Sequence, residues 1–186
     1  MGVEEPQFEV KQTWGEVEVR SYGPTVVAQT LVTGNFSDAG NEGFKKLAGY
    51  IFGGNQGSQK IEMTAPVIQE PQKKGEKIEM TAPVLQEGAE QNRWVSFVMP
   101  AGRTLENLPR PNDPTVVLKE IPARKMAVLR YSGTWSEERY QEKVQALLEV
   151  LKTQGAKLKG APILARYNPP WIPWFLRRNE VQVEIE

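Results

Sequence analysis

The chain has 186 residues, and its 23 lysines and arginines balance its 23 acidic residues to a formal net charge of zero. It contains neither histidine nor cysteine, which excludes disulfides, thiolate nucleophiles, Ser-His-Asp catalysis, and metal or haem ligation by imidazole or thiolate. A chain without net positive charge offers no broad basic field to a nucleic acid, so we expect no nucleic-acid partner.

The chain begins with a polar, acidic stretch. Residues 1–10 lack the apolar core of a signal peptide. No run of 18 apolar residues occurs later in the sequence. We therefore expect a cytoplasmic protein without a transmembrane segment.

The first half predicts strands around one helix. A hairpin turns at Trp14-Gly15, and the apolar, β-branched run at 25–32 predicts the next strand. Apolar residues at helical spacing then predict a helix that stops at Gly53-Gly54 and has Ser37 as its N-cap. The shared face of this helix consists of Phe36, Gly40, Phe44, Leu47 and Ile51.

A nearly exact repeat follows the first helix. Residues 60–70 return as residues 77–87 with one substitution, and in both copies apolar and polar residues alternate. This alternation predicts strands at 61–69 and 78–86, which we expect to form a hairpin through a polar turn. A further strand is predicted at 93–99.

The second half repeats the order of the first half. The motif Gly-Asn-Phe-Ser at 34–37 resembles Gly-Thr-Trp-Ser at 133–136, and each motif lies between a strand-like run and a helical pattern. The predicted elements of the second half are a strand at 125–131, a helix between Ser136 and Gly155, and strands at 162–167 and 180–185. The shared face of the second helix consists of Tyr140, Val144, Leu147 and Leu151.

Both halves, at about 8–100 and 115–186, therefore read strand, helix, strand, strand. A loop at 101–114 with three prolines joins them. We predict an α+β fold in which a distorted antiparallel barrel or sheet carries two helices. We expect it to be built from a duplicated βαββ unit and to form a single domain over residues 1–186.

Several segments resemble the SOUL haem-binding protein family. They are residues 39–55, the doubled Met-Thr-Ala-Pro-Val, and residues 95–100, 108–114 and 177–181. The resemblance covers nearly the whole chain and implies binding of haem or another tetrapyrrole on an apolar groove beside the first helix, where basic residues meet the propionates. It also implies kinship with gyrase-inhibitor-type domains, which hold amphipathic or cationic compounds.

The resemblance makes the first helix one wall of a ligand groove. Three glycines in this helix each cost about 1 kcal/mol relative to alanine, which indicates close approach by a ligand or by other backbone. Lys45 and Lys46 flank the apolar face and either pair with ligand carboxylates or lie in solvent. Met63 either contacts the ligand or fills the core. The candidate apolar contacts of the helix are Phe44, Leu47, Ala48 and Ile51, which in the alternative interpretation pack on the protein's own sheet.

The most unusual segment is the Trp- and Pro-rich stretch at 168–178. Its prolines stiffen a loop that can display Trp171 and Trp174 for stacking on a ring, with Arg177 or Arg178 taking a carboxylate. The same composition suits a membrane interface. A lid with buried aromatic side chains is the third interpretation.

Together these patterns predict non-catalytic binding of haem, another tetrapyrrole or a hydrophobic ligand, without histidine or cysteine ligation. One alternative is a sensor-like module for amphipathic cations, for which Glu62 and Glu79 would have to face a pocket rather than solvent. Another is a protein- or membrane-interaction module that uses the Trp/Pro loop. No nucleophile elbow, phosphate loop or metal-spaced carboxylate cluster indicates an enzyme or a metal site.

Overall fold

The computed structural model of the chain describes residues 4–71, 91–168 and 171–186. Within these ranges the helices are α1 (Phe36–Ile51), α2 (Glu137–Thr153) and the short 3₁₀ helix η1 (Trp174–Leu176). Neither α1 nor α2 combines the length and the apolar character that crossing a membrane requires. The strands are β1 (Phe8–Trp14), β2 (Val17–Tyr22), β3 (Thr25–Gly34), β4 (Val67–Pro71), β5 (Gln91–Val98), β6 (Val116–Ile121), β7 (Arg124–Tyr131), β8 (Ile163–Arg166) and β9 (Asn179–Ile185).

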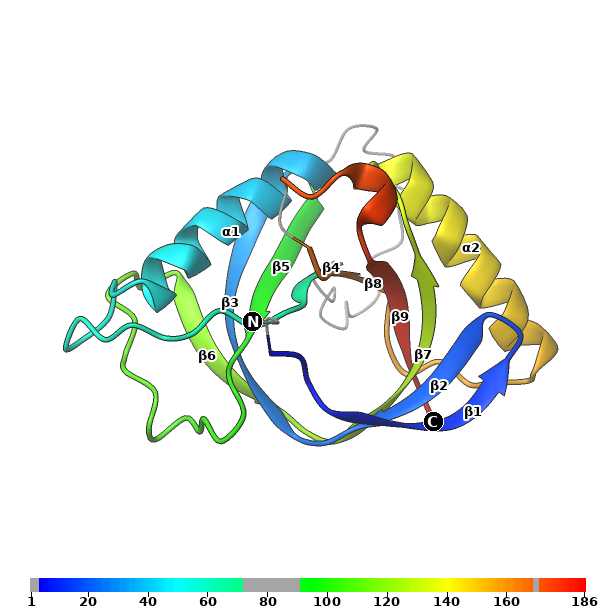
Figure 1. The fold of residues 1–186 in the computed structure, drawn as a ribbon, viewed down its shortest axis with the longest axis horizontal. Coiled ribbons are helices and arrows are strands. Elements are labelled where there is room, and N and C mark those ends of the chain that lie inside the picture. Colours follow the sequence, from blue (N-terminus) through cyan, green and yellow to red (C-terminus); the bar gives the residue numbers. More distant parts are fainter. Residues whose placement is uncertain (1–3, 72–90, 169–170) are drawn as a thin grey trace, which may run out of the picture.

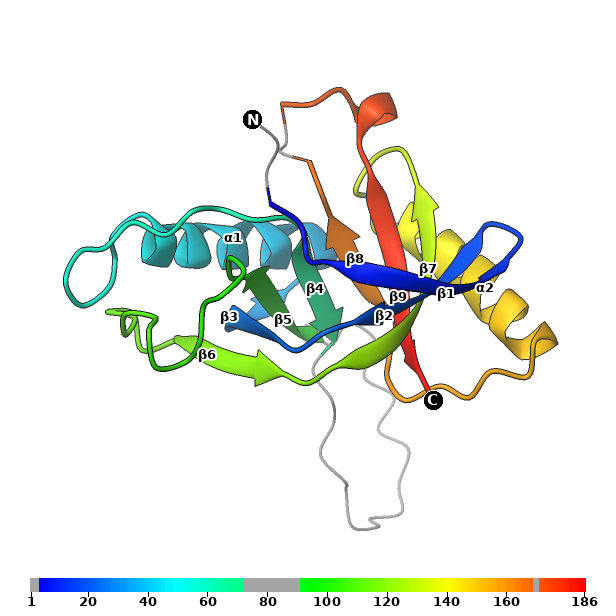
Figure 2. The same ribbon diagram turned by 60° about the horizontal axis from the view of Figure 1, so that its bottom comes forward.

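These strands form one antiparallel sheet in the order β1-β2-β7-β9-β8-β4-β5-β3-β6. The sheet curves like a cup, with α1 against the outside of β3 and β5 and α2 against the outside of β7 and β9 (Figure 1). Figure 2 shows the two helices on the same outer side of the curve. The prediction of an α+β fold with a distorted sheet and two helices is confirmed, but the sheet is open, with β1 and β6 as its edges.

The two halves share one order of elements and one pairing pattern. In β3–α1–β4–β5 the last strand lies between the other two, and the same is true of β7–α2–β8–β9. The two units join where β4 pairs with β8. The descent of both units from one duplicated segment stays a prediction.

The strand that precedes each unit pairs with the other unit. β2 runs through Gly23-Pro24 into β3, yet it pairs with β7. β6 runs through Pro122-Ala123 into β7, yet it pairs with β3. A proline donates no backbone hydrogen bond, so these two connections are natural places for the chain to leave one half of the sheet and enter the other.

The helix starts match the sequence prediction in one case of two. Ser136 is the N-cap of α2, and its hydroxyl accepts a hydrogen bond from the Arg139 amide. The N-cap of α1 is Asn35 rather than Ser37, because the Asn35 side chain accepts a hydrogen bond from the Asp38 amide at 2.9 Å. Asparagine is as good an N-cap as serine. Residue type alone therefore could not decide whether Asn35 or Ser37 caps the helix.

The predicted helix stops and most predicted strands are confirmed. Gly53 and Gly155 follow the two helices with φ angles of +115° and +67°, a backbone conformation that favours glycine. The hairpin at Trp14 is the turn between β1 and β2. The predicted strands at 25–32, 93–99, 125–131, 162–167 and 180–185 correspond to β3, β5, β7, β8 and β9. β6 has no counterpart among the predicted strands.

The first repeat differs from its prediction. The strand predicted at 61–69 is wrong at its start: β4 begins only at Val67, and before it Thr64 makes a single bridge to Glu4. The predicted hairpin is wrong at 67–69, because β5 and β8 occupy both edges of this stretch. The second predicted strand, at 78–86, lies outside the described residues.

Three apolar clusters hold the sheet and helices together. One lies between α2 and the sheet, one lies between α1 and the sheet, and one lies on the concave face around Val27, Ile68 and Met126. The predicted face of α2 is buried in the first cluster, and it consists of Tyr140, Val144, Leu147 and Leu151.

Gly43 sets the approach of α1 to the sheet. A Cβ atom at this position would lie 2.5 Å from two side-chain atoms of Val95 on β5. At Gly49, six residues further along α1, a Cβ atom would meet nothing within 4 Å. Close packing on the protein's own sheet therefore explains one of the three helix glycines.

We predict opposite effects for two alanine substitutions in α1. Gly43→Ala forces α1 away from β5 and lowers the free energy of unfolding by about 1–3 kcal/mol. Gly49→Ala gains helix propensity and raises it by up to about 1 kcal/mol. Urea unfolding of both variants measures the difference, and equal effects would contradict the close contact with Val95.

Candidate functional site

A groove of about 210 Å³ opens beside the N-terminal half of α1, and we call it the helix groove. α1 contributes one wall, and the segment that leads into β4 contributes the floor. The loop before α2 and the chain that follows β8 close the far side. The lining includes the side chains of Phe44, Met63, Gln69, Trp135, Arg166 and Trp171.

Apolar side chains make up most of the helix groove. Phe44 is 37% exposed and its ring packs edge-on against Phe97, with centroids 5.3 Å apart. Trp171 is 79% exposed. Such side chains offer flat surfaces that a planar ligand can cover, and covering them removes apolar area from water.

Arg166 is the one charged side chain among the described residues that line the helix groove. Its guanidinium donates to the Gln69 Oε1 atom at 3.1 Å and lies 5.0 Å from the ring centre of Trp135. No carboxylate in the described part of the chain pairs with it. Burial lowers the pKa of Arg166 to about 10, and the positive charge of Arg177 acts in the same direction.

The surroundings of Arg166 leave it short of partners. Its Nε atom is buried without a hydrogen-bond partner among the described residues. Gly40 makes room for the guanidinium, because a Cβ atom there would lie 3.2 Å from Nη1 of Arg166. A partly buried cation with one neutral partner is costly to keep, and an anionic group in the groove would offset that cost.

The structure brings three of the predicted ligand contacts together: Phe44, Met63 and Trp171 all line the helix groove. Leu47 and Ile51 lie fully buried in the core between α1 and the sheet, as the alternative interpretation had it.

The other candidates on α1 lie outside the groove. Ala48 is half-buried and is not part of the lining. Lys46 pairs with Glu42 at 3.0 Å, and Lys45 is exposed.

The C-terminal candidates separate into two groups. Trp174 is exposed on η1, outside the groove lining. Arg177 packs over the Trp135 ring at 4.2 Å and donates to the Ile172 carbonyl oxygen. Arg178 turns away from the groove toward Glu180.

Sequence reasoning missed Arg166, Gln69 and Trp135. Each lies in a segment that the sequence singled out: Arg166 in the strand predicted at 162–167, Gln69 in the first repeat, and Trp135 in the motif before the second helix. No sequence signal shows that these three segments meet, because the pairing of β4 with β8 joins residues about 100 positions apart.

Glu180 is the fully buried carboxylate on the concave face of the sheet. Arg20 and Arg178 donate to it at 3.0 Å and 2.9 Å, and the Tyr167 hydroxyl and Gln182 amide donate at 2.9 Å and 2.8 Å. Burial acts to raise the pKa of Glu180, but the two guanidinium groups outweigh it and hold the pKa below the usual range. Four side chains of the protein itself therefore supply the charge and the hydrogen bonds that this carboxylate needs.

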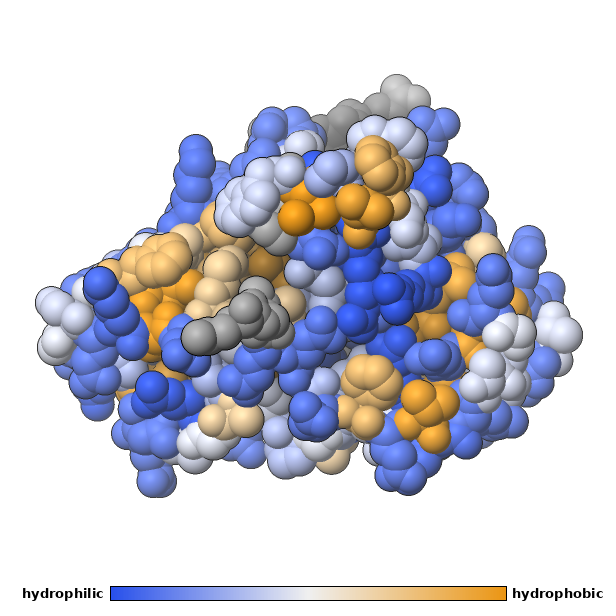
Figure 3. Space-filling view, viewed as in Figure 1, coloured by the Kyte–Doolittle hydropathy of each residue, from blue (hydrophilic) through white to orange (hydrophobic). Residues whose placement is uncertain are grey.

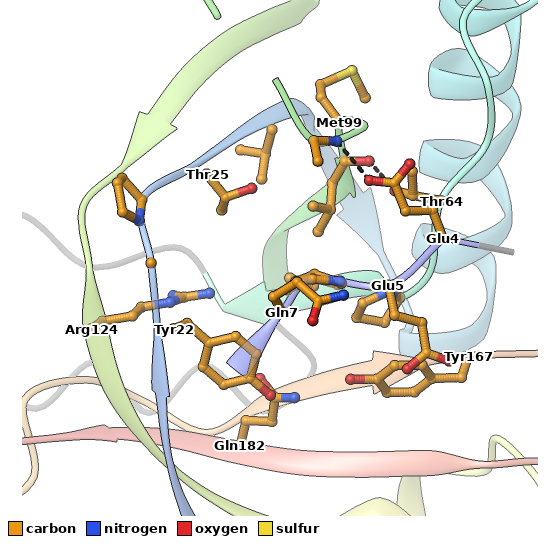
Figure 4. A pocket seen from close by; sticks show the side chains of 18 of the residues that line it. Glu4, Glu5, Gln7, Tyr22, Thr25, Thr64, Met99, Arg124, Tyr167 and Gln182 are labelled. Carbon is orange, nitrogen blue, oxygen red and sulfur yellow. Dashed lines mark hydrogen bonds between the residues drawn. The ribbon is translucent and has the colours of Figure 1, made fainter. Parts of the chain in front are cut away.

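A second cavity, of about 320 Å³, lies on the same concave face, and we call it the concave cavity. Residues 4–7, the N-terminal segment, form one side of it (Figure 4). Thr64 and Tyr167 line both this cavity and the helix groove, so the two spaces share a wall.

The SOUL heme-binding protein pattern matches residues 3–74 and 68–184, and the chain belongs to this family. Heme-binding protein 2 of Mus musculus is 27% identical over 181 residues, which cover 91% of this chain and 82% of that protein. Heme-binding protein 2 of Homo sapiens is 29% identical over 171 residues, covering 90% and 77%. The crystal structure of the EcmrR C-terminal domain has the same fold, with a TM-score of 0.66 and 12% identity over 91% of this chain and 96% of that domain.

The Glu180 cluster predicts a pH-dependent stability. Because the pKa of Glu180 is lowered in the folded state, its contribution is present above the unfolded-state pKa of about 4.3. That contribution is lost as pH falls through the folded-state pKa. Glu180→Gln removes the buried carboxylate that Arg20 and Arg178 share and leaves them only their more exposed partners, Glu18 and Glu5. We expect it to lower the free energy of unfolding at pH 7 by roughly 3–5 kcal/mol.

Urea unfolding of both proteins from pH 7 to pH 3 measures this effect. The difference between the natural protein and Glu180→Gln should shrink in the acidic range. Glu62→Gln, which alters an exposed carboxylate, is the matched control and should leave stability nearly unchanged. A constant difference over the whole pH range would contradict the charge pairing.

Proposed function

We propose that this protein binds haem or a related tetrapyrrole reversibly in the helix groove and catalyses no reaction there. Membership in the SOUL family supports the ligand class. The observation that carries the site is the position of Arg166, a partly buried cation that lines an apolar groove and has no carboxylate partner among the described residues. A tetrapyrrole is complementary to both features, because its apolar faces can cover the apolar lining and its anionic propionates can pair with Arg166.

The residues of the groove fit this ligand class. The rings of Phe44 and Trp171 supply surfaces for a macrocycle face, and Arg166 supplies a planar donor for a propionate. The groove volume of about 210 Å³ holds only part of a macrocycle. The remainder would lie against the exposed side of Trp171, which suits reversible binding.

The iron of a bound haem would have neither imidazole nor thiolate as a ligand, since the chain has no histidine and no cysteine. Bound haem would supply a redox-active iron. Met63 is the one sulfur-bearing side chain among the described residues of the groove. The hydroxyl of Tyr167, also in the lining, already donates to Glu180. We therefore propose that affinity rests on the faces and carboxylates of the ligand.

Titration with haem and with two metal-free porphyrins tests the roles of the macrocycle face and of the propionate carboxylates. Haem should give a saturable shift of its Soret band, and protoporphyrin IX should compete. Arg166→Gln should weaken protoporphyrin IX roughly tenfold or more, the loss of one charge-assisted hydrogen bond. The same variant should leave the affinity for the dimethyl ester of protoporphyrin unchanged, whereas Trp171→Ala should weaken both ligands.

Lys45→Gln is the matched control, because it removes a cation from α1 outside the groove lining. It should leave both affinities unchanged. Equal loss of acid and ester in Arg166→Gln would show that the arginine only shapes the groove. The absence of a saturable shift, together with no competition from metal-free porphyrin, would contradict tetrapyrrole binding.

The described residues give little support to the alternative function, the sensing of amphipathic cations. Glu62 is exposed, and Glu79 lies outside the described residues. The buried carboxylate on the concave face is Glu180, and Arg20 and Arg178 already neutralise it. A cationic ligand would have to displace a guanidinium to reach it.

An exposed apolar tip favours a second candidate function, docking on a lipid membrane surface. Trp171, Trp174, Phe175 and Leu176 are each more than half exposed on a short, Pro-containing segment. Figure 3 shows apolar groups gathered around η1, apart from those over α1. Both neighbouring arginines make contacts within the protein, Arg177 on Trp135 and Arg178 with Glu180. Insertion of aromatic side chains would therefore drive docking, with little help from charge.

Co-sedimentation with phosphatidylcholine vesicles tests this candidate. The natural protein should bind, and raising the salt concentration should not release it. Trp174→Ala combined with Phe175→Ala should abolish binding, whereas Phe52→Ala, at an exposed phenylalanine after α1, should not. Binding that needs anionic lipid and disappears in salt would contradict docking by the apolar tip.

A further inference from the structure

The concave cavity has the composition of a ligand site and is separate from the helix groove, with which it shares only the wall at Thr64 and Tyr167. We propose that it binds a small amphipathic monoanion, such as a medium-chain carboxylate. The proposal does not depend on tetrapyrrole binding, because its recognition groups belong to other strands. The cavity has three parts: an apolar body, a cationic end and an anionic end.

The body of the concave cavity is apolar. Val27, Ile68, Val98 and Met99 line it, and the first three belong to the buried cluster on the concave face. Its volume of about 320 Å³ lies at the lower end of the roughly 300–1,000 Å³ that small-molecule pockets occupy. A short aliphatic or aromatic body fits that space.

One end of the cavity carries a cation without an acidic partner. Arg124 lies directly opposite Tyr22 on the β2–β7 ladder, and both side chains line the cavity. Among the described residues, none makes an ion pair or a hydrogen bond with the Arg124 side chain. A guanidinium of this kind is the preferred partner of a carboxylate.

The phenol of Tyr22 adds a neutral donor to the lining of the cavity, with its hydroxyl directed toward Gln182 rather than Arg124 (Figure 4). Its oxygen accepts a hydrogen bond from Arg20 at 3.2 Å, which leaves its own proton available. Burial raises the pKa of Tyr22 above its usual value, so the group stays protonated. Arg124 therefore meets the charged head group of the ligand, and Tyr22 offers a neutral donor to a polar atom elsewhere in the cavity.

The opposite end of the cavity carries carboxylates. Figure 4 shows Glu4 and Glu5 across the cavity from Arg124. Glu4 accepts a hydrogen bond from the Ala101 amide at 2.7 Å, and Glu5 pairs with Arg178 at 2.9 Å. A second negative group on the ligand would meet these carboxylates, so the cavity selects a monoanion over a dianion.

Calorimetric titration with three ligands of equal chain length tests the proposal: octanoate, octanol and octanedioate. Octanoate should bind saturably, and the other two should bind at least roughly tenfold more weakly. Arg124→Gln should reduce octanoate affinity to that of octanol, and Arg124→Lys should retain part of it. Arg130→Gln, on the same strand but outside the cavity lining, is the matched control and should bind octanoate normally.

Nuclear magnetic resonance of methyl groups locates the ligand. Octanoate should shift the methyl signals of Ile68, Val98 and Met99 and leave that of Met63 unchanged. Loss of octanoate binding in Arg166→Gln but not in Arg124→Gln would place the carboxylate in the helix groove and overturn the proposal. So would the absence of saturable binding to folded protein, or octanedioate binding as tight as that of octanoate.

Discussion

The structure depends on the exchange of strands between its two halves. β2 pairs with β7 and β6 pairs with β3, so each half completes its sheet with a strand that leads into the other half. This exchange bends the sheet into a cup with two helices outside and one concave face inside. It also supports the proposal that residues 1–186 form one domain, because neither half keeps all of its strands. The helix groove lies where the two halves meet, with α1 on one side and the chain after β8 on the other.

Two charges near this junction have opposite surroundings: Glu180 is fully buried and Arg166 is partly buried. Glu180 has two guanidinium partners and two neutral donors, so it holds β2, β9 and the chain after β8 together. Arg166 has one neutral partner and aromatic neighbours. Removing one partner from a paired buried charge destabilises a protein. A charge without such a partner is instead stabilised when a ligand of opposite charge binds to it. The first arrangement is structural, and the second supports the proposed binding of an anionic ligand.

Local sequence signals were sufficient for much of the fold. The helical spacing of Tyr140, Val144, Leu147 and Leu151 identified the buried face of α2, and alternation identified most strands. The partner of β4 could not be predicted, because the repeat suggested a local hairpin while the actual neighbours are distant in sequence. The same limit hid Arg166: its residue type is visible, but its lack of a carboxylate partner depends on which strands surround it. For Lys45 the sequence correctly predicted a position on the first helix and left open whether the side chain meets a ligand or solvent. The structure shows that the side chain is exposed.

The strand exchange also affects how the chain reaches its fold during synthesis. Tyr22 pairs with Arg124, and Thr25 pairs with Ile121. The strands that pair with one edge of β2 and with one edge of β3 are therefore made about 100 residues later. Contacts this distant in sequence slow folding, because a long loop must close before they form. Until β6 and β7 leave the ribosome, one edge of β3 and one edge of β2 have no strand to pair with. We expect the nascent first half to depend on chaperones over that interval.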